Sequence, residues 1–338
     1  YAFNTDILGN TRTRWDIGAT TAPQAIFRSV GKDSTASLLN GAGNDLSIAL
    51  GSDGHTIATF ASAVSNSIGI GDVILYDPDN AGGVDTVGFL SERIDSQNFI
   101  IKNAAGDNAT ITTVNSQSWD IYRAYKSLQW TYQGIENDGI PLALRDFDTW
   151  TGAKDLVASN EQLNYAFYAD APETASTRIN TNSWTTSSLN RLKYFVPTKS
   201  YEVGESQGHN GVWDDSKALV DKYSANDAFE FVTIDNVILE GFQIRATSGA
   251  FQNAIVIFNH AASTKEKEYI VRNNIITSNT PVLNDKKGIY IAGSSAEDSR
   301  SKFYLYNNIV YGFNNSTNNY GIHIHTGDGT IDNAFVYN

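Results

Sequence analysis

The chain contains no cysteine and no methionine in 338 residues, and it has few prolines (6) and few charged residues (18%). Without cysteine, a disulfide framework, a cysteine metal site and a cysteine nucleophile are all excluded. The sequence has no signal peptide and no apolar run long enough to cross a membrane as a helix. Because there is no initiator methionine, we expect Tyr1 to lie within a longer exported precursor.

The charge balance is strongly acidic. The 37 Asp and Glu residues outnumber the 24 Lys and Arg residues, which gives a formal net charge of −13. Such a surface repels nucleic acid and anionic lipid, so we predict no nucleic-acid partner and no membrane insertion. A polyanionic polysaccharide is also disfavoured unless Ca²⁺ bridges the charges. The simpler interpretation is that acidity keeps an extracellular protein soluble.

Asn, Ser, Thr and Gly are abundant, a composition typical of β-structure with many polar turns, and the last third of the chain repeats itself. Asn recurs after short apolar segments at intervals of 37, 34 and 31 residues, and residues 288–291 (GIYI) and 321–324 (GIHI) form a second series. Several short strands per interval, with stacked turn asparagines, are what a parallel β-helix requires. A β-sandwich or jelly roll also has many short strands, but it gives no reason for the Asn recurrence. The aligned residues are Asn236, Asn273, Asn307 and Asn338.

We predict an all-β fold, a right-handed parallel β-helix (a solenoid) preceded by a small antiparallel β domain. Residues 1–22 form a separate segment. Residues 23–119 form the antiparallel domain, because strand-like runs alternate there with Gly, Asp and Asn turns. Residues 120–338 form the β-helix, which opens with a short amphipathic helix near 125–132 and stops in mid-turn.

Two stretches resemble known proteins. The repeats within 120–338 resemble the right-handed β-helix turns of the pectin-lyase-like superfamily, a resemblance that is specific for fold and poor for activity. Residues 6–12 (DILGNTR) and 15–19 (WDIGA) resemble the D-x-x-G-x-x-R…DIGA segment that closes the C-terminal end of many bacterial exported β-helix proteins.

Here the closing segment lies at the N-terminus, and the last repeat is unfinished. The resemblance implies either a piece of a protein with consecutive β-helices or a subunit whose segment closes its neighbour. The second alternative predicts head-to-tail self-association into a homopolymer. The residues that carry this assembly prediction are Asp6, Gly9, Arg12, Trp15, Asp16 and Asn338.

Residues 77–85 (DPDNAGGVD) are the best single site motif, with Asp77, Asp79 and Asp85 at positions 1, 3 and 9 of a glycine-containing loop. Carboxylate oxygens that converge from alternate positions suit Ca²⁺, and the loop resembles calcium loops between strands of extracellular β proteins. It departs from that pattern at position 5 (Ala81) and position 12 (Gly88). The alternative is a metal-free Asp/Asn/Gly turn.

Two further groups are candidates for ligand binding. His323 and His325 alternate with isoleucines, so both imidazoles are expected on one outer face, with Tyr290 stacked beside His323. This patch fits a sugar or a metal ion, and the alternative is a pair of solvated surface histidines. His209 and Trp213 share a polar loop, where the indole either stacks on a sugar or simply packs.

Motifs for catalysis are missing from the sequence, so enzymatic activity stays open and is disfavoured. Arg245, Arg272 and Arg300 have no carboxylate cluster that matches the lyase pattern. The main prediction is an extracellular or cell-surface structural or adhesive protein, a subunit of a head-to-tail fibre. The alternatives are a polysaccharide lyase or glycoside hydrolase of the pectin-lyase-like fold, and a non-catalytic glycan-binding module.

Overall fold

The computed structural model describes residues 22–41, 43–148, 150, 153–174, 177–180, 184–222, 227–232, 234–247, 253–259, 267–278, 286–293, 301–313, 319–325 and 333–337. Arg300 lies outside these ranges. So do all residues of the assembly prediction, which are Asp6, Gly9, Arg12, Trp15, Asp16 and Asn338.

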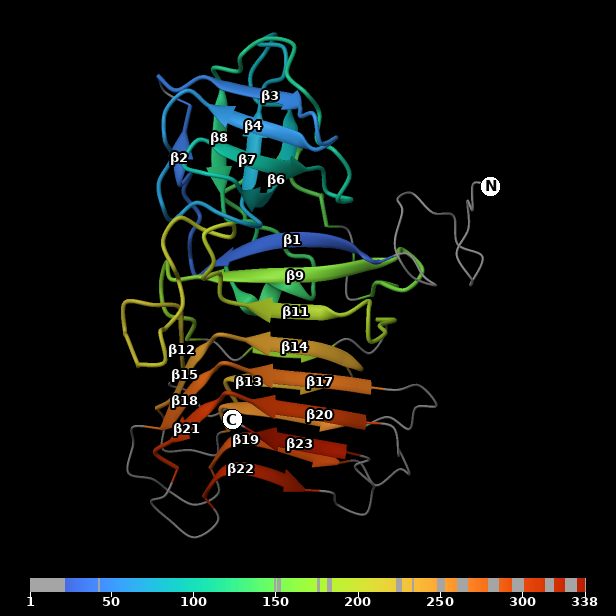
Figure 1. Cartoon of the computed structure of the whole chain (residues 1–338), viewed down its shortest axis with the longest axis vertical. Helices are drawn as coiled ribbons and strands as arrows, with labels where there is room; N and C mark the ends of the chain where they lie inside the picture. The colour runs from blue at the N-terminus through green and yellow to red at the C-terminus, as the bar shows by residue number, and fades with distance from the viewer. Residues whose placement is uncertain are drawn as a thin grey trace.

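The described part of the chain is nearly all β-structure, and most of its strands belong to three parallel sheets (Figure 1). The seven-stranded sheet has the order β1 (Gln24–Gly31), β9 (Glu161–Tyr168), β11 (Leu192–Phe195), β14 (Asn236–Glu240), β17 (Lys267–Arg272), β20 (Ser301–Tyr306), β23 (Asn333–Tyr337). The five-stranded sheet is β10 (Thr177–Asn180), β13 (Phe229–Val232), β16 (Ile255–Asn259), β19 (Lys287–Gly293), β22 (Tyr320–His325). The four-stranded sheet is β12 (Leu219–Lys222), β15 (Gln243–Ala246), β18 (Ile275–Ser278), β21 (Ile309–Tyr311).

From β14 onward, consecutive strands enter the three sheets in rotation. β14, β15 and β16 lie in three different sheets, and β17 then pairs in parallel with β14. The same cycle brings β20 beside β17 and β23 beside β20. This topology is compatible with the predicted parallel β-helix.

Alternation along the strands separates an interior from an exterior. In β17 and β20 every second side chain is buried, as the pleat requires. The inward rings of Tyr269 and Phe303 stack with their centroids 4.8 Å apart. Inward aliphatic and aromatic residues from the three parallel sheets join in one continuous core, whose burial is the main favourable term for this body.

The turns after β14, β17 and β20 correct one part of the predicted repeat. Arg272 pairs with Glu240 and with Tyr306, so the residues that follow them, Gly241, Asn273 and Asn307, occupy the equivalent position. All three have positive φ (81°, 57° and 54°), a conformation that Gly and Asn tolerate best. Asn273 and Asn307 are therefore neighbours as predicted.

Asn236 was aligned wrongly with these turn residues. It is the first residue of β14 and pairs with Glu268, not with Asn273. In the turns after β17 and β20, the next residue forms a side-chain ladder. Asn274 donates from its Nδ2 to the Oδ1 of Asn308 (3.0 Å).

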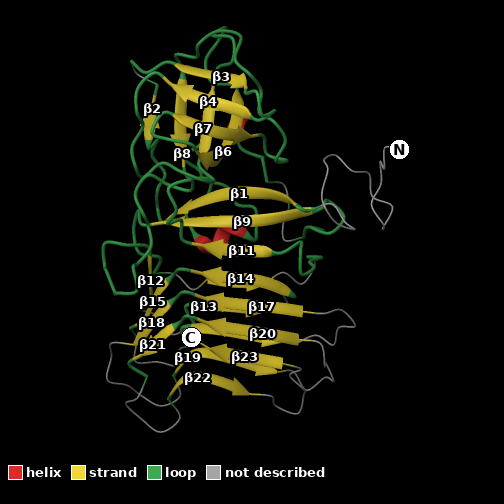
Figure 2. Cartoon of the chain, viewed as in Figure 1, coloured by secondary structure: helices red, strands yellow, loops and turns green. Residues whose placement is uncertain are grey.

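The second unit is an antiparallel sheet, at the top of the view in Figure 2. Its strand order is β2 (Leu39–Asn40), β8 (Trp119–Tyr122), β5 (Val73–Tyr76), β6 (Thr86–Arg93), β7 (Asn98–Lys102), β4 (Thr56–Phe60), β3 (Leu46–Leu50). This matches the sequence prediction of a mostly antiparallel region, with one difference. The first strand of the range 23–119, β1, pairs in parallel with β9 and belongs to the seven-stranded sheet.

Strand β5 is buried on both faces. Val73 and Leu75 face the core of the parallel body, whereas Ile74 and Tyr76 face the core of the antiparallel sheet. Because successive side chains of a strand point to opposite faces, one strand supplies a wall to each core. The two units therefore share a continuous packed boundary.

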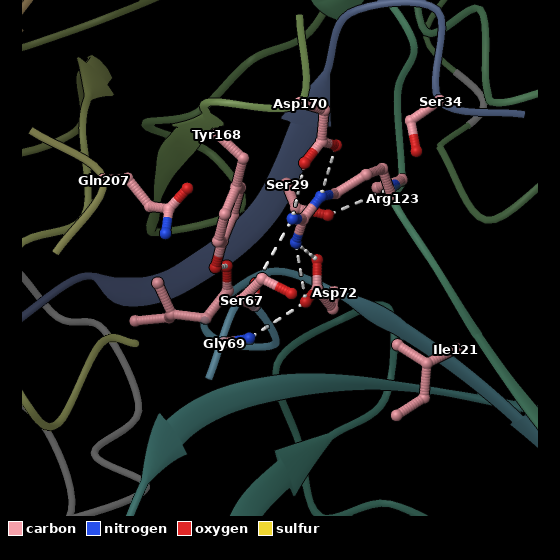
Figure 3. A network of polar contacts seen from close by, with 12 residues as sticks. Ser29, Ser34, Ser67, Gly69, Asp72, Ile121, Arg123, Tyr168, Asp170 and Gln207 are labelled. Atoms are coloured by element: carbon pink, nitrogen blue, oxygen red, sulfur yellow. Dashed lines mark hydrogen bonds and ion pairs between the residues drawn. The ribbon is translucent and has the colours of Figure 1, made fainter. Parts of the chain in front are cut away.

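A buried arginine reinforces this boundary (Figure 3). Nη1 of Arg123, just after β8, donates to both carboxylate oxygens of Asp72 (2.7 and 2.9 Å), and Nε and Nη2 donate to Asp170 (2.9 Å each). Its guanidinium carbon lies 3.5 Å from the ring centre of Tyr168. Burial opposes the charge of Arg123, but the two carboxylates outweigh it and raise its pKa.

The predicted helix near 125–132 is present in a shorter form as α1 (Leu128–Thr131). The Oγ of Ser127 caps it by accepting from the N–H of Gln129 (3.2 Å), and the Oγ1 of Thr131 lies 3.0 Å from the Tyr194 hydroxyl of β11. A 3-10 turn, η1 (Leu142–Leu144), follows. Among the described residues, no helix is both long enough and apolar enough to span a membrane.

Candidate functional site

The outer face of the seven-stranded sheet carries a row of charged and aromatic side chains. Strand register places Glu240 beside Arg272, Arg272 beside Tyr306, and Tyr306 beside Tyr337. These four residues, one on each of β14, β17, β20 and β23, are called the outer row. In β17 and β20 these positions alternate with buried residues, so the pleat that builds the core also places Arg272 and Tyr306 on the outer face.

Direct contacts link the outer row. The Oε2 of Glu240 accepts from the Nη2 of Arg272 (2.8 Å) and lies 3.0 Å from the Nζ of Lys193. The Nη1 of Arg272 donates to the hydroxyl oxygen of Tyr306 (2.8 Å). The rings of Tyr306 and Tyr337 are stacked, with centroids 5.2 Å apart and planes 4° from parallel. A parallel stack, Tyr304 on Phe335, lies beside it (5.1 Å).

The electrostatics of this row keep its groups charged. Burial alone would raise the pKa of Glu240, but Lys193 and Arg272 outweigh burial and lower it. Burial works against the Arg272 charge, yet the bonds to Glu240 and Tyr306 raise its pKa. Glu240 is therefore an ionised acceptor, and Arg272 is a protonated donor.

A pocket of about 160 Å³ opens where Glu240 begins the row. Its lining residues are Lys193, Phe195, Val196, Thr198, Lys199, Glu202, His209, Glu240, Gly241 and Asn273. The pocket thus combines two lysines and two carboxylates with a histidine. The mixture suits a polar ligand with many hydroxyl groups, because it offers both donors and acceptors.

His209, one of the residues predicted from the sequence, lies in this pocket. Its Nδ1 accepts from the N–H of Gly211 (3.2 Å), so the proton resides on Nε2, which donates to the carbonyl oxygen of Asn273 (3.0 Å). Burial lowers the pKa of His209, and the Asn273 bond offsets this only in part. His209 is therefore a neutral side chain that ties its loop to the turn after β17.

Trp213, predicted together with His209, lies at a different place. Its ring packs under the guanidinium of Arg245 (5.3 Å), and its Nε1 donates to the Oδ1 of Asp215 (3.0 Å). Arg245 also bonds Asp221. The indole is half-buried and engaged with its own loop, so it does not line the pocket with His209.

The second predicted group does come together. Tyr290 of β19 pairs with His323 of β22, and their ring centroids lie 5.2 Å apart. His325 follows on the same face, 5.8 Å from His323. The sequence missed Tyr320, whose ring lies 4.7 Å from His323. Tyr290, Tyr320, His323 and His325 form the aromatic–histidine cluster, on the outside of the five-stranded sheet.

The Asp77 loop is closed by its own backbone. Oδ2 of Asp77 accepts from the N–H of Gly83 (2.8 Å), Oδ1 accepts from Asp79 (3.2 Å), and Oδ1 of Asp79 accepts from Ala81 (3.0 Å). Burial would raise the pKa of Asp77, but these backbone donors outweigh it and lower the pKa. Within the described ranges no three His, Asp or Glu side chains are grouped to hold one metal ion. Calcium binding by Asp77, Asp79 and Asp85 stays a prediction.

A larger hollow, of about 520 Å³, is lined by residues of the segment 134–148, among them Glu136, Asp146 and Asp148. Two of its carboxylates, those of Glu136 and Asp148, are already engaged. Glu136 accepts from the N–H groups of Asp146 (2.5 Å) and Asp148 (2.6 Å), and Asp148 accepts from Arg28 (2.8 Å) and from the Tyr125 hydroxyl (2.6 Å). These bonds hold the loop in place, and they use much of the hydrogen-bonding capacity of Glu136 and Asp148.

Sequence reasoning missed the outer row because it found no carboxylate partner for Arg272. Glu240 stands 32 positions earlier and reaches Arg272 only through the strand register. The available signal was the alternation within residues 267–272 and 301–306, which puts Arg272 and Tyr306 on the outer face. Comparison with known protein families, curated proteins and solved structures finds no match to this chain.

Proposed function

We propose that this protein is an extracellular, adhesive glycan-binding protein and that its parallel-stranded body is a right-handed β-helix of the pectin-lyase-like kind. The rotation of consecutive strands through three parallel sheets supports the β-helix. The lack of cysteine and the net charge of −13 support an exported, soluble location.

The outer row is the observation that carries this proposal. Neighbouring strands are about 4.8 Å apart, so the row from Glu240 to Tyr337 spans about 14 Å across the sheet. An extended polysaccharide that runs across the strands would meet one side chain per strand. Tyr337 is 54% exposed and Tyr306 is half-buried. Such tyrosine rings stack on the apolar faces of sugars, while Arg272 and Glu240 serve hydroxyl groups as donor and acceptor.

The charge states favour binding over cleavage. A glycoside hydrolase of the usual type needs one carboxyl group with a raised pKa to act as general acid. Glu240 has the opposite shift, because Lys193 and Arg272 hold it ionised. A base for elimination must be unprotonated, and the raised pKa of Arg272 works against that. The outer row therefore suits the binding of a glycan better than its cleavage.

The test is native affinity electrophoresis in gels that contain xylan, mannan, dextran or alginate. We expect at least one polysaccharide to retard the protein without release of reducing ends. Tyr306→Ala and Arg272→Met should each weaken the retardation at least about threefold, since each removes one stacking or hydrogen-bonding contact.

Tyr290→Ala is the matched control, because Tyr290 is an outward tyrosine on the five-stranded sheet. It should leave retardation unchanged. Equal retardation of wild type and Tyr306→Ala would count against the outer row, and loss on Tyr290→Ala would move the site to the other sheet. Release of reducing ends would favour the enzymatic alternative.

A second candidate function is self-association into a fibre, and a specific observation favours it. In the described part of each parallel sheet, β21, β22 and β23 are edge strands, and Phe335, Val336 and Tyr337 are 43%, 52% and 54% exposed. An unpaired edge with apolar side chains can accept strands from another copy.

Sedimentation velocity and electron microscopy test this assembly. We expect species that grow with protein concentration and become elongated particles, whereas Val336→Lys should stay monomeric because it places a charge at the edge. Monomeric wild type at about 100 μM would exclude such an assembly, since that concentration exceeds the Kd of a typical specific contact.

A further inference from the structure

We propose a binding site for a divalent transition-metal ion, Zn²⁺ or Cu²⁺, at His323 and His325 on β22. This site lies on a different sheet from the outer row and does not depend on the proposed glycan binding. The two residues are two positions apart on one strand, so their side chains leave the same face. Their ring centroids are 5.8 Å apart.

This separation fits a shared ion. A metal about 2.1 Å from each ring nitrogen lies roughly 3.2 Å from each ring centre, so at a tetrahedral angle two rings on one ion have centres about 5.2 Å apart. The observed 5.8 Å is close to that separation and slightly longer. The two ring centres therefore have to approach by roughly 0.6 Å to share one tetrahedral ion.

Neighbouring rings restrict these imidazoles. Tyr290 and Tyr320 pack at 5.2 and 4.7 Å from the ring of His323. The hydroxyl oxygen of Tyr290 lies 3.4 Å from the Nδ1 of His325. When Nδ1 carries the proton, this contact leaves Nε2 of His325 to bind the ion, as second-shell partners of metal-bound histidines commonly do. Lys287 is a basic group beside the aromatic–histidine cluster, with its Nζ 5.0 Å from the Tyr290 ring centre.

The composition of the chain makes histidine its most suitable ligand for a borderline metal ion. It has no cysteine or methionine and five histidines, and imidazole is the ligand that Zn²⁺ and Cu²⁺ then prefer. Of the other three histidines, His260 lies outside the described residues, both nitrogens of His209 are hydrogen-bonded, and His55 Nδ1 contacts the Nζ of Lys102 (3.3 Å). Two protein ligands leave further coordination positions open to water or to an external ligand.

The experiment measures Zn²⁺ affinity of the whole chain by competition with a chromophoric chelator, and Cu²⁺ ligation by electron paramagnetic resonance. We expect one site per chain with two imidazole nitrogens in the Cu²⁺ spectrum. His323→Gln and His325→Gln should each lower the Zn²⁺ affinity at least tenfold, because each removes one of the two protein ligands.

His55→Gln is the matched control and should bind as wild type does. Circular dichroism of the His323 and His325 variants will separate ligand loss from loss of fold, and His325→Gln is a mild change because His325 is exposed. Wild-type binding that survives the double variant overturns the proposal. So does a Cu²⁺ spectrum with fewer than two imidazoles, or loss of the site in His55→Gln.

Discussion

Asn308 accepts two hydrogen bonds from Asn274 one strand away, from the backbone N–H (3.1 Å) and from Nδ2 (3.0 Å). Asn274 in turn accepts from the N–H of Phe242 (2.9 Å), and Asn308 donates to the carbonyl oxygen of Val271 (2.8 Å). Buried Asn274 and half-buried Asn308 thus satisfy backbone groups of the preceding turn and strand.

Replacing Asn274 with Ala should lower the free energy of unfolding by about 2–3 kcal/mol, because it leaves the buried N–H of Phe242 without an acceptor. Urea denaturation monitored by fluorescence will measure this. The neighbouring substitution Asn273→Gly is the control. Asn273 has φ 57°, which Gly adopts without strain, so its effect should stay within about 0.5 kcal/mol. Equal effects of the two changes would contradict the ladder.

Arg123→Met should destabilise the protein by about 3–5 kcal/mol, because the buried carboxylate of Asp72 would lose its charge partner. Arg123→Lys keeps the charge but loses the fork that reaches both Asp72 and Asp170, so a smaller loss is expected. Thermal unfolding by calorimetry will rank the three proteins. A Met variant as stable as wild type would show that the arginine adds nothing to the junction.

Lowering the pH should remove the contribution of Glu240 to the free energy of unfolding. Its folded-state pKa is lowered by Lys193 and Arg272 below its unfolded value, so its stabilisation is fully present above about pH 4.3 and is lost as pH falls through the folded pKa. The stability difference between wild type and Glu240→Gln should be constant from pH 5 to 7 and should shrink towards pH 3. Urea unfolding at each pH measures it. A difference that does not change with pH would contradict this assignment.

Asp77→Ala should lower the Tm even in the presence of EGTA, because the loop would lose the acceptor of three backbone N–H groups. Asp79→Ala removes one such acceptor contact and should have a smaller effect. The same experiment tests the calcium prediction. An ion held by Asp77, Asp79 and Asp85 would raise the wild-type Tm in Ca²⁺ but not that of Asp77→Ala.

The sequence predicted some of these features residue by residue. Residues 288–291 and 321–324 share one pattern 33 positions apart, and the strand period of two then places Tyr290 next to His323, as confirmed by the register. The alternation inside each strand depends only on local pattern, which is why it could be read without a structure.

Other features depend on where the chain returns after uneven loops. The left-handed turn position is Gly241 in one turn and Asn273 in the next, so residue identity alone led to the wrong choice of Asn236. The pairing of Glu240 with Arg272 requires the register of strands more than 30 positions apart. Strand β1 was grouped with its sequence neighbours, because adjacent strands usually pair, but it pairs with β9 instead.

The pairing of β1 with β9 means that the antiparallel sheet is an insertion within the parallel body. The chain contributes Gln24–Gly31 to the seven-stranded sheet, leaves it for some 130 residues, and returns with Glu161–Tyr168. A fragment cut at residue 120 would therefore lack its own first strand and would expose the flank of β9. Variants that separate the two units should instead excise the insertion and rejoin the chain after β1.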